Sequence, residues 1–142
     1  MLRKSGVFFL IFVCIVGFIL SCHGNKGTES DWKYVGTIKD AKGQDVEVLM
    51  DMAHLEINGN TRRFWIRYMD IKDPKTGARY IRQTGYWEIN CFDRTLYRLA
   101  EEYYNPEGEL LGSTEKKERV EYSSYESLGA KMSDVACRYG GK

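Results

Sequence analysis

The segment from Thr61 to Lys72 constrains the fold of this chain most strongly, because it is apolar on both faces of a predicted strand. Its large hydrophobic residues alternate between the two faces, with Phe64, Ile66 and Tyr68 on one and Trp65, Met69 and Ile71 on the other. Successive side chains of a strand point to opposite faces, so this strand is expected at the centre of a sheet with both faces covered. A partner subunit or a loop is the expected cover of the second face.

Shorter segments of strand character lie on both sides of this central strand. Aromatic residues make up 13% of the chain, which favours a packed, β-rich domain over disorder. The predicted strands cover residues 32–38, 45–52, 55–57, 61–72, 79–92, 93–104, 109–113 and 119–122. The turn signals between them include Asn58-Gly59-Asn60, Asp73 to Gly77 and Asn105 to Gly108. Connections this short predict an antiparallel meander.

The hydrophobic period changes from two to 3.6 residues after Tyr122. Ser123 can cap a helix, and Glu126, three residues further on, completes a capping box. The apolar residues that follow fall within one helical stripe, which consists of Tyr125, Leu128, Met132, Val135, Ala136 and Tyr139. Gly140-Gly141 ends the predicted helix. A chain of 142 residues is long enough for one such domain, so we predict an α+β fold in which a meander precedes one C-terminal helix.

The chain opens with the pattern of a secretory signal peptide. Two basic residues, Arg3 and Lys4, precede an apolar run from Val7 to Leu20. This run is shorter than the about 20 residues that a membrane-spanning helix needs, which favours a cleaved signal peptide over residues 1–21. An uncleaved N-terminal anchor helix is the alternative.

The end of the apolar run, Ile19-Leu20-Ser21-Cys22, resembles a bacterial lipobox. In this class of protein the cysteine thiol takes a diacylglycerol, cleavage precedes the cysteine, and the new N-terminus is acylated, for example with palmitate. We therefore expect Cys22 to be the lipidated N-terminus that attaches the chain to a membrane. Residues 22–31 are expected to form a flexible tether, and residues 32–142 the domain. The expected location is the bacterial cell envelope, at the outer membrane, facing either the surface or the periplasm.

Export leaves two cysteines in the mature domain, Cys91 and Cys137, because Cys14 lies in the signal peptide and Cys22 carries the lipid. Disulfides persist in oxidising compartments, so an exported chain with two remaining thiols most simply pairs them. Two free buried thiols are the alternative. On a helical wheel Cys137 falls about 180° from Leu128, on the side opposite the apolar stripe, which argues against the pairing. The pairing therefore requires either a helix covered on two sides or a last turn that departs from ideal geometry.

The residues of the domain offer little material for catalysis. His54 is its only histidine, and together with Asp51 it offers a metal ion only two ligands. The chain has no nucleophile elbow, P-loop or dinucleotide-binding glycine motif. Glu101 and Glu102 are adjacent in a predicted strand, so they point to opposite faces and cannot share one acid–base site. With a net charge of +1, the chain is not a nucleic-acid-binding polycation. We therefore predict no catalytic residue, metal, cofactor or nucleic-acid partner.

Charge is segregated along the chain. The segment 62–82 holds seven basic residues against two acidic ones, whereas the segment 101–121 holds seven acidic residues against three basic ones. Such segregation can steer a charged partner, an acidic protein or a sulfated glycan. The candidate contact residues are then Arg62, Arg67, Lys72, Lys75, Arg79 and Arg82. In the alternative interpretation the two segments face each other across neighbouring strands and offset one another. If the basic segment proves not to bind, the next candidate contact surface is the tyrosine-bearing strand 97–104.

The order of these features resembles the surface-adhesin protein E family of bacterial lipoproteins over about residues 32–137. The matching pieces are Asp51 to Ile57 before Phe64-Trp65-Ile66, Asn90-Cys91 followed by Arg94 and Arg98, the turn from Tyr103 to Gly108, and a serine-rich entry to a helix that ends near Cys137. The resemblance implies a six-stranded antiparallel sheet, a C-terminal helix on its concave face, and a disulfide that ties the two together. It also implies a surface binding role, in some members as a dimer.

From these observations we expect a non-enzymatic, lipid-anchored, adhesin-like binding protein of the bacterial envelope. Its expected partners are the membrane, through the N-terminal lipid, and a protein or glycan, with homodimerisation as a further option. Fold does not fix function, so two alternatives remain open. One is a small envelope enzyme or enzyme regulator on the same fold, and the other is a periplasm-facing structural lipoprotein.

Overall fold

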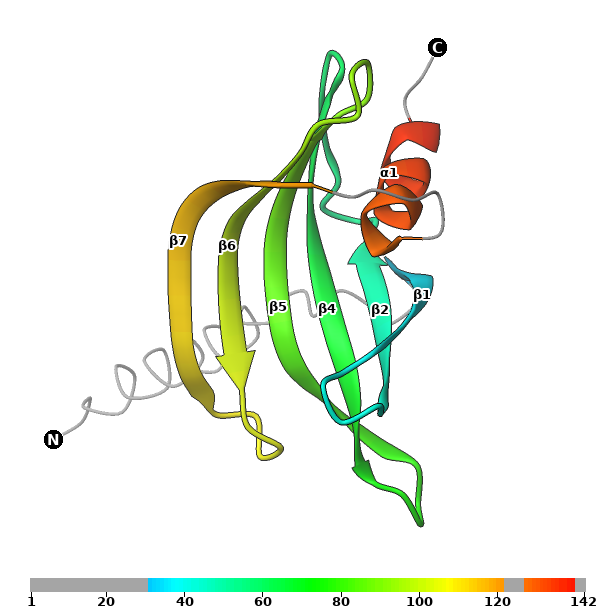
Figure 1. Cartoon of the computed structure of the whole chain (residues 1–142), viewed down its shortest axis with the longest axis vertical. Coiled ribbons are helices and arrows are strands. Elements are labelled where there is room, and N and C mark those ends of the chain that lie inside the picture. Colours follow the sequence, from blue (N-terminus) through cyan, green and yellow to red (C-terminus); the bar gives the residue numbers. More distant parts are fainter. Residues whose placement is uncertain (1–30, 122–126, 140–142) are drawn as a thin grey trace, which may run out of the picture.

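The computed structural model describes residues 31–121 and 127–139, which form one curved antiparallel sheet with a helix on its concave face (Figure 1). The elements are β1 Trp32–Lys39, β2 Asp45–Asp51, β3 Glu56–Asn58, β4 Thr61–Asp73, β5 Ala78–Asn90, β6 Leu96–Tyr104, β7 Leu110–Val120 and α1 Leu128–Arg138. The predicted α+β meander is confirmed. The sheet has seven strands rather than six, because β3 is a short addition that pairs only with β4.

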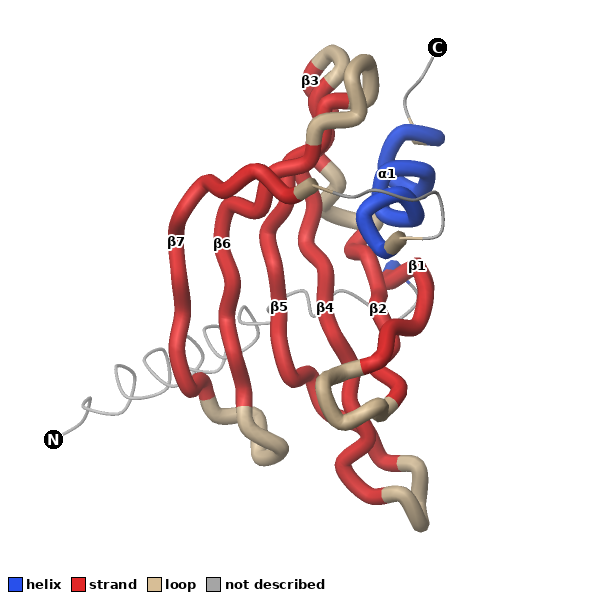
Figure 2. Tube along the Cα trace, viewed as in Figure 1, coloured by secondary structure: helices blue, strands red, loops and turns tan. Residues whose placement is uncertain are grey.

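The strands follow one another across the sheet in the order β1-β2-β4-β5-β6-β7 (Figure 2). The last two segments predicted as separate strands, 109–113 and 119–122, belong largely to one continuous strand, β7. The two longest strands, β4 and β5, each have 13 residues and pair along almost their whole length. Their neighbours stop earlier, since β2 pairs with β4 only as far as Met69 and β6 pairs with β5 only as far as Gln83. The β4–β5 hairpin therefore projects beyond the rest of the sheet (Figure 1).

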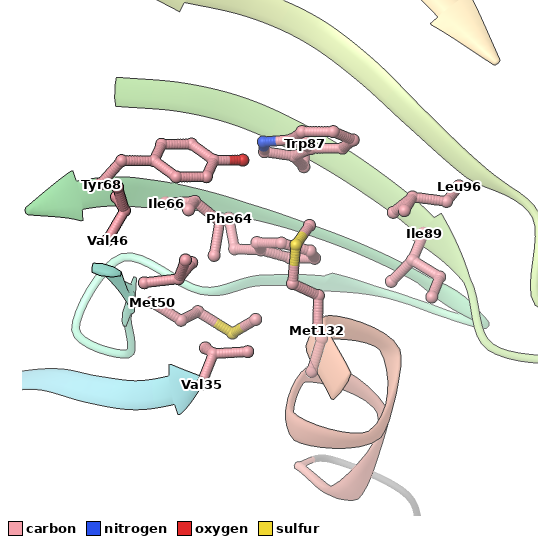
Figure 3. Close-up of a cluster of buried hydrophobic side chains, with 12 residues drawn as sticks. Val35, Val46, Met50, Phe64, Ile66, Tyr68, Trp87, Ile89, Leu96 and Met132 are labelled. Carbon is pink, nitrogen blue, oxygen red and sulfur yellow. The ribbon is translucent and has the colours of Figure 1, made fainter. Parts of the chain in front are cut away.

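The concave face of the sheet carries the hydrophobic core, and α1 closes it (Figure 3). The alternation of β2, β4 and β5 sends one set of side chains to this face. Together with one residue each from β6 and α1, the fully buried large hydrophobic ones are Phe64, Met50, Ile66, Ile89, Leu96, Met132, Val46 and Val48. Met132 and Ala136 of α1 pack into this cluster. The helix contacts β1 and β4, so it covers one side of the concave face. Among the described residues, no helix is long and apolar enough to cross a membrane.

The prediction that both faces of β4 are covered is wrong for the convex face. Within the described residues no further layer lies on it, and the apolar residues of β4 on this side are shielded only by neighbouring side chains. Trp65 stacks on Tyr86 of β5, with ring centroids 4.9 Å apart, and Ile71 is 44% exposed. An antiparallel sheet tolerates one solvated face, because cross-strand aromatic pairs protect each other there.

The helix begins at Leu128, and Ser127 is its N-cap, with the Ser127 hydroxyl accepting a hydrogen bond from the Ala130 N–H at 3.2 Å. The predicted cap at Ser123 and its partner Glu126 lie outside the described residues. The buried residues of the helix are Ala130, Met132, Ser133 and Ala136. Small residues dominate this face, which lets the helix backbone approach the sheet closely.

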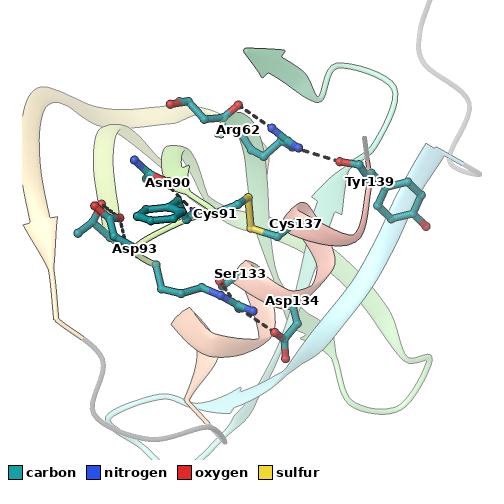
Figure 4. Close-up of a disulfide and its surroundings, with 12 residues drawn as sticks. Arg62, Asn90, Cys91, Asp93, Ser133, Asp134, Cys137 and Tyr139 are labelled. Carbon is teal, nitrogen blue, oxygen red and sulfur yellow. Dashed lines mark hydrogen bonds and ion pairs between the residues drawn. A yellow bond between two sulfur atoms is a disulfide. The ribbon is translucent and has the colours of Figure 1, made fainter. Parts of the chain in front are cut away.

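A disulfide joins Cys91, directly after β5, to Cys137 in the last turn of α1, with Cα atoms 5.6 Å apart (Figure 4). The predicted pairing is therefore present in the structure. The helical-wheel objection fails because the buried face is centred on Ser133 rather than on Leu128. Cys137 lies one turn beyond Ser133 on that face.

Replacing both Cys91 and Cys137 by alanine is expected to lower the free energy of unfolding by about 4 kcal/mol. The bridge closes a loop with a sequence separation of 46, and the chain-entropy model assigns a loop of this size about that value. Urea unfolding of the mature protein measures the difference. A reducing agent should destabilise the wild-type protein to the same extent and leave the double alanine variant unchanged. Two reactive thiols in the denatured, unreduced protein would contradict the bridge.

The concave face also depends on a missing side chain at Gly85 of β5. The indole of Trp87 lies over this glycine, and a Cβ at Gly85 would sit 2.5 Å from Trp87 Nε1. Gly85→Ala is therefore expected to destabilise the protein by about 1–3 kcal/mol, the usual cost of overpacking. Gly112→Ala in β7 is the matched control, because no atom lies within 4 Å of its Cβ position. Equal unfolding midpoints for the two variants would show that Trp87 moves aside freely.

Candidate binding surface

Arg62 does not belong to an exposed contact surface, because it is only 3% exposed. The strand alternation turns it to the concave side, beside the end of α1. Its Nε donates to the Tyr139 carbonyl at 3.1 Å, and its Nη1 donates to the carbonyls of Gly59 at 2.6 Å and Thr61 at 3.1 Å. The guanidinium thus satisfies carbonyls at the helix C-terminus and in the β3–β4 turn. This corrects the expectation that Arg62 contacts a partner.

Arg79 and Arg82 form ion pairs with acidic residues of β2, of β4 and of the β1–β2 turn. Arg79 forms an ion pair with Glu47 of β2, and Arg82 Nη1 lies 3.3 Å from a carboxylate oxygen of both Asp40 and Asp70. Ion pairs therefore offset the charges of both arginines, although the alternative interpretation expects the segment 101–121 to supply the acids. Their partners come from residues 40–70, however, and not from the acidic segment 101–121.

The carboxylate of Asp40 also fixes the β1–β2 turn. It accepts the backbone N–H of Gln44 at 2.9 Å and that of Lys42 at 2.8 Å. The hydrogen bond from Gln44, reinforced by Lys42 and Arg82, lowers the pKa of Asp40 below its usual value. The carboxylate stays ionised at neutral pH, so it continues to neutralise Arg82.

Arg67 lies on the convex face within a row of aromatic rings and cations. Its guanidinium stands over the Trp32 ring at 4.2 Å, and Lys117 of β7 stands over Tyr97 at 4.5 Å. Glu88 accepts Arg63 and Lys117, each at 2.8 Å. The hydrogen bond from Lys117, followed by that from Arg63, lowers the pKa of Glu88. Arg63, Arg67 and Lys117 therefore all interact with side chains of the sheet itself.

The projecting end of the β4–β5 hairpin is the remaining part of the basic segment, and we call residues 71–79 the hairpin tip. Lys72 and Lys75 are exposed here, and within the described residues no ion pair joins either ammonium group to an acid. Asp73 instead closes the turn: it accepts the Lys75 backbone N–H at 2.9 Å and the Thr76 hydroxyl at 3.0 Å. These hydrogen bonds, the one from Lys75 first, lower the pKa of Asp73. The tip thus presents two solvated cations beside the exposed side chain of Ile71.

The candidate acid–base residues are occupied by structural contacts. Asp51 accepts the N–H groups of Ala53 and His54 and lies 2.7 Å from His54 Nδ1, which makes the pair a turn cap between β2 and β3. Glu101 and Glu102 have separate partners on opposite faces, as predicted. Glu101 accepts Gln83, Arg98 and Tyr103, and Glu102 accepts Thr84 and Tyr104. Among the described residues, no three potential metal ligands cluster.

The tyrosines mainly serve the sheet itself. Tyr103, Tyr104 and Tyr86 donate their hydroxyl protons to glutamates on neighbouring positions, Glu101, Glu102 and Glu56. Burial, with the nearby charge of Glu101, raises the pKa of Tyr68 to about 12. The tyrosine-bearing strand 97–104 is therefore a weaker candidate for a contact surface than the hairpin tip.

Phe92 is a highly exposed aromatic residue that the sequence did not indicate as part of a contact surface. The predicted strand 79–92 ends at Phe92, but β5 ends at Asn90. Phe92 therefore lies in the turn that follows, and its side chain is 85% exposed. The turn formers Asn90 and Asp93 on either side are the sequence signal that places it there.

A family model described as surface-adhesin protein E matches residues 32–138 of the chain. No curated protein and no solved structure matches. The match covers every strand of the sheet and the whole of α1, including both cysteines of the disulfide. It indicates an adhesin-like protein located at the bacterial cell surface or envelope. The chain belongs to the surface-adhesin protein E family.

Proposed function

We propose that this protein is a lipid-anchored, non-enzymatic, adhesin-like binding protein of the bacterial outer membrane, and that the hairpin tip contacts its partner. The observation that supports this most directly is the tip itself, which projects beyond the neighbouring strands and carries Lys72 and Lys75 without acidic partners among the described residues. Solvated cations on a projecting turn are accessible to a large partner from several directions. The partner class that fits them is an acidic protein or a sulfated glycan.

The tip is also suited to binding by its rigidity. The Gly77 N–H donates to the Asp73 carbonyl at 2.8 Å, and Gly77 has a φ of 71°, a conformation that glycine adopts without strain. Together with the Asp73 side-chain contacts, this fixes the turn before any partner arrives. A preformed contact site loses less conformational entropy on binding than a disordered one.

The lipid anchor rests on the lipobox-like sequence before Cys22. Cys22→Ser is expected to release the protein from membranes or to leave it as an unprocessed precursor, because serine offers no thiol for the diacylglycerol. Fractionation of cells into membrane and soluble parts, with detection of the domain, measures this. Cys14→Ser is the matched control and should fractionate like the wild type. Normal membrane retention of processed Cys22→Ser protein would contradict the anchor.

Charge reversal at the tip tests the contact surface, with heparin as the sulfated-glycan probe. Lys72→Glu combined with Lys75→Glu should weaken heparin binding about tenfold or more, and wild-type binding should fall as salt rises, because solvated charges are screened. The measurement is immobilised-heparin affinity at several salt concentrations. Lys42→Glu combined with Lys116→Glu, also at exposed lysines, makes the same change in net charge away from the tip.

Equal losses for the two double variants would show that net charge alone governs binding. Unchanged binding of the tip variant would move the contact surface to the tyrosine-bearing strand 97–104. The orientation of the domain is a separate question, and protease treatment of intact cells answers it. Loss of the domain supports surface display, whereas full protection supports the periplasm-facing alternative.

A further inference from the structure

The β3–β4 and β5–β6 turns lie at the end of the sheet opposite the hairpin tip (Figure 1), and two large apolar side chains are exposed there. Phe92 in the β5–β6 turn is 85% exposed, and Ile57 in β3 is 49% exposed. The two turns are joined, because the Cys91 N–H donates to the Asn60 carbonyl at 2.7 Å. We call this region, the β3–β4 and β5–β6 turns with Phe92 and Ile57, the apolar end. Ile71, Leu110 and Leu111 are exposed toward the other end, so the apolar end is set apart by its aromatic ring, which is the most exposed large apolar side chain in the described part of the chain. Neighbouring exposed apolar groups can form an interaction site or a membrane contact.

Hydrogen bonds of the β5–β6 turn fix the backbone at Phe92. Asn90 accepts the Phe92 N–H through Oδ1 at 2.9 Å and the Arg94 N–H through its carbonyl at 2.8 Å. Asp93 accepts the N–H of Thr95 at 3.0 Å. Arg94 has a φ of 61°, which is unfavourable for a residue with a side chain. The turn therefore adopts a strained backbone conformation at Arg94, while the ring of Phe92 lies outside the hydrophobic core.

The helix braces the same turn from the side. The Cys91–Cys137 disulfide attaches its start to α1. Arg94 Nη1 then donates to the Ser133 hydroxyl at 2.8 Å and lies 2.9 Å from an Asp134 carboxylate oxygen (Figure 4). An aromatic ring on a backbone fixed in this way loses less conformational entropy on entering an apolar environment than one on a mobile loop.

The position where the domain begins sets the reach of the proposed lipid anchor. Trp32 pairs with Asp51, and the neighbouring Met50 pairs with Ile66, so β1 starts at about the level of Trp65 in β4. At about 3.3 Å per residue, Asn60 at the apolar end lies about 15 Å from this level, and Asp73, where β4 ends at the hairpin tip, lies about 25 Å from it. The chain from Cys22 to Asp31 spans at most about 30 Å when fully extended. The apolar end is therefore well within reach of the bilayer, and the tip is the most distant part of the sheet.

We infer that the apolar end docks on the lipid surface, with Phe92 inserted at the boundary between head groups and acyl chains and Ile57 beside it. This inference rests on the lipid anchor of the proposed function. An aromatic and an aliphatic side chain suit the membrane interface, where apolar groups gain by burial among the lipid chains. The contact is apolar rather than ionic, so it holds on zwitterionic phospholipid and at high salt. Docking in this way directs the hairpin tip away from the membrane.

The test uses the mature, lipidated chain in phosphatidylcholine vesicles, with lipids brominated in the acyl chains as fluorescence quenchers. Phe92→Trp places a reporter at the apolar end, and Leu111→Trp places one at a residue 68% exposed at the other end of β7. The three native tryptophans contribute equally to both variants. Relative to the wild type, the added emission of Phe92→Trp should be quenched about twofold or more strongly than that of Leu111→Trp. The difference should persist when salt is raised severalfold, and Ile57→Ser should reduce it.

Equal quenching of the two reporters in vesicle-bound protein would overturn the docking while leaving the lipid anchor intact. Quenching that disappears at high salt would overturn the apolar contact in favour of an ionic one. A chain that separates from the vesicles without detergent would refute the anchor, and the docking with it. If Phe92→Trp is unquenched by lipid but becomes shielded from a water-soluble quencher on mixing with cell-surface extract, the apolar end binds a protein instead.

Discussion

The attachment of α1 to the concave face holds this structure together. Without the helix, Phe64, Ile66 and Met50 would face solvent on a sheet that has no second layer among its described residues. Burial of side chains of this size contributes about 1.5–3 kcal/mol each, which makes helix docking a large part of the stability of the domain. The contact is secured at the helix C-terminus by the disulfide and by Arg62, whose guanidinium reaches the Tyr139 carbonyl. The same two links position the turns at the apolar end, so core packing and surface geometry depend on one another.

Local patterns predicted the meander and the helix, because strand and helix periods are properties of neighbouring residues. The hairpin turn at Asp73 to Gly77 was predictable for the same reason, since proline and glycine fix backbone angles locally. The buried face of α1 was not predictable from local patterns. Its centre is Ser133, a polar residue whose burial depends on Arg94 donating to its hydroxyl. The apolar stripe of a helix does not reveal a hydrogen bond to a residue that is distant in sequence. The helical wheel therefore put Cys137 on the face opposite the sheet, whereas it lies on the buried face.

Charge was the least predictable property of the candidate surface. The basic residues are consecutive in sequence, but strand alternation divides them between faces. Arg62 turns to the helix, whereas Arg67 turns to Trp32 on the convex side. Arg79 and Arg82 then find acids on β2, on β4 and in the β1–β2 turn. A count of charges along the chain therefore overstates the positive surface, and only Lys72 and Lys75 of the predicted contact residues keep a solvated charge with no acidic partner in the described part of the chain.

The length of β4 and β5 separates two kinds of surface. Thirteen residues at about 3.3 Å each place the hairpin tip about 40 Å from the apolar end. That distance is several times the Debye length of about 8 Å at physiological ionic strength, so the lysines at the tip do not sense charges near the other end. The proposed apolar contact at one end and the proposed ionic contact at the other can therefore be altered independently, since they share neither residues nor an electrostatic field. The long hairpin thus separates the two proposed contact sites without a second domain, and the stiffness of paired strands keeps them apart.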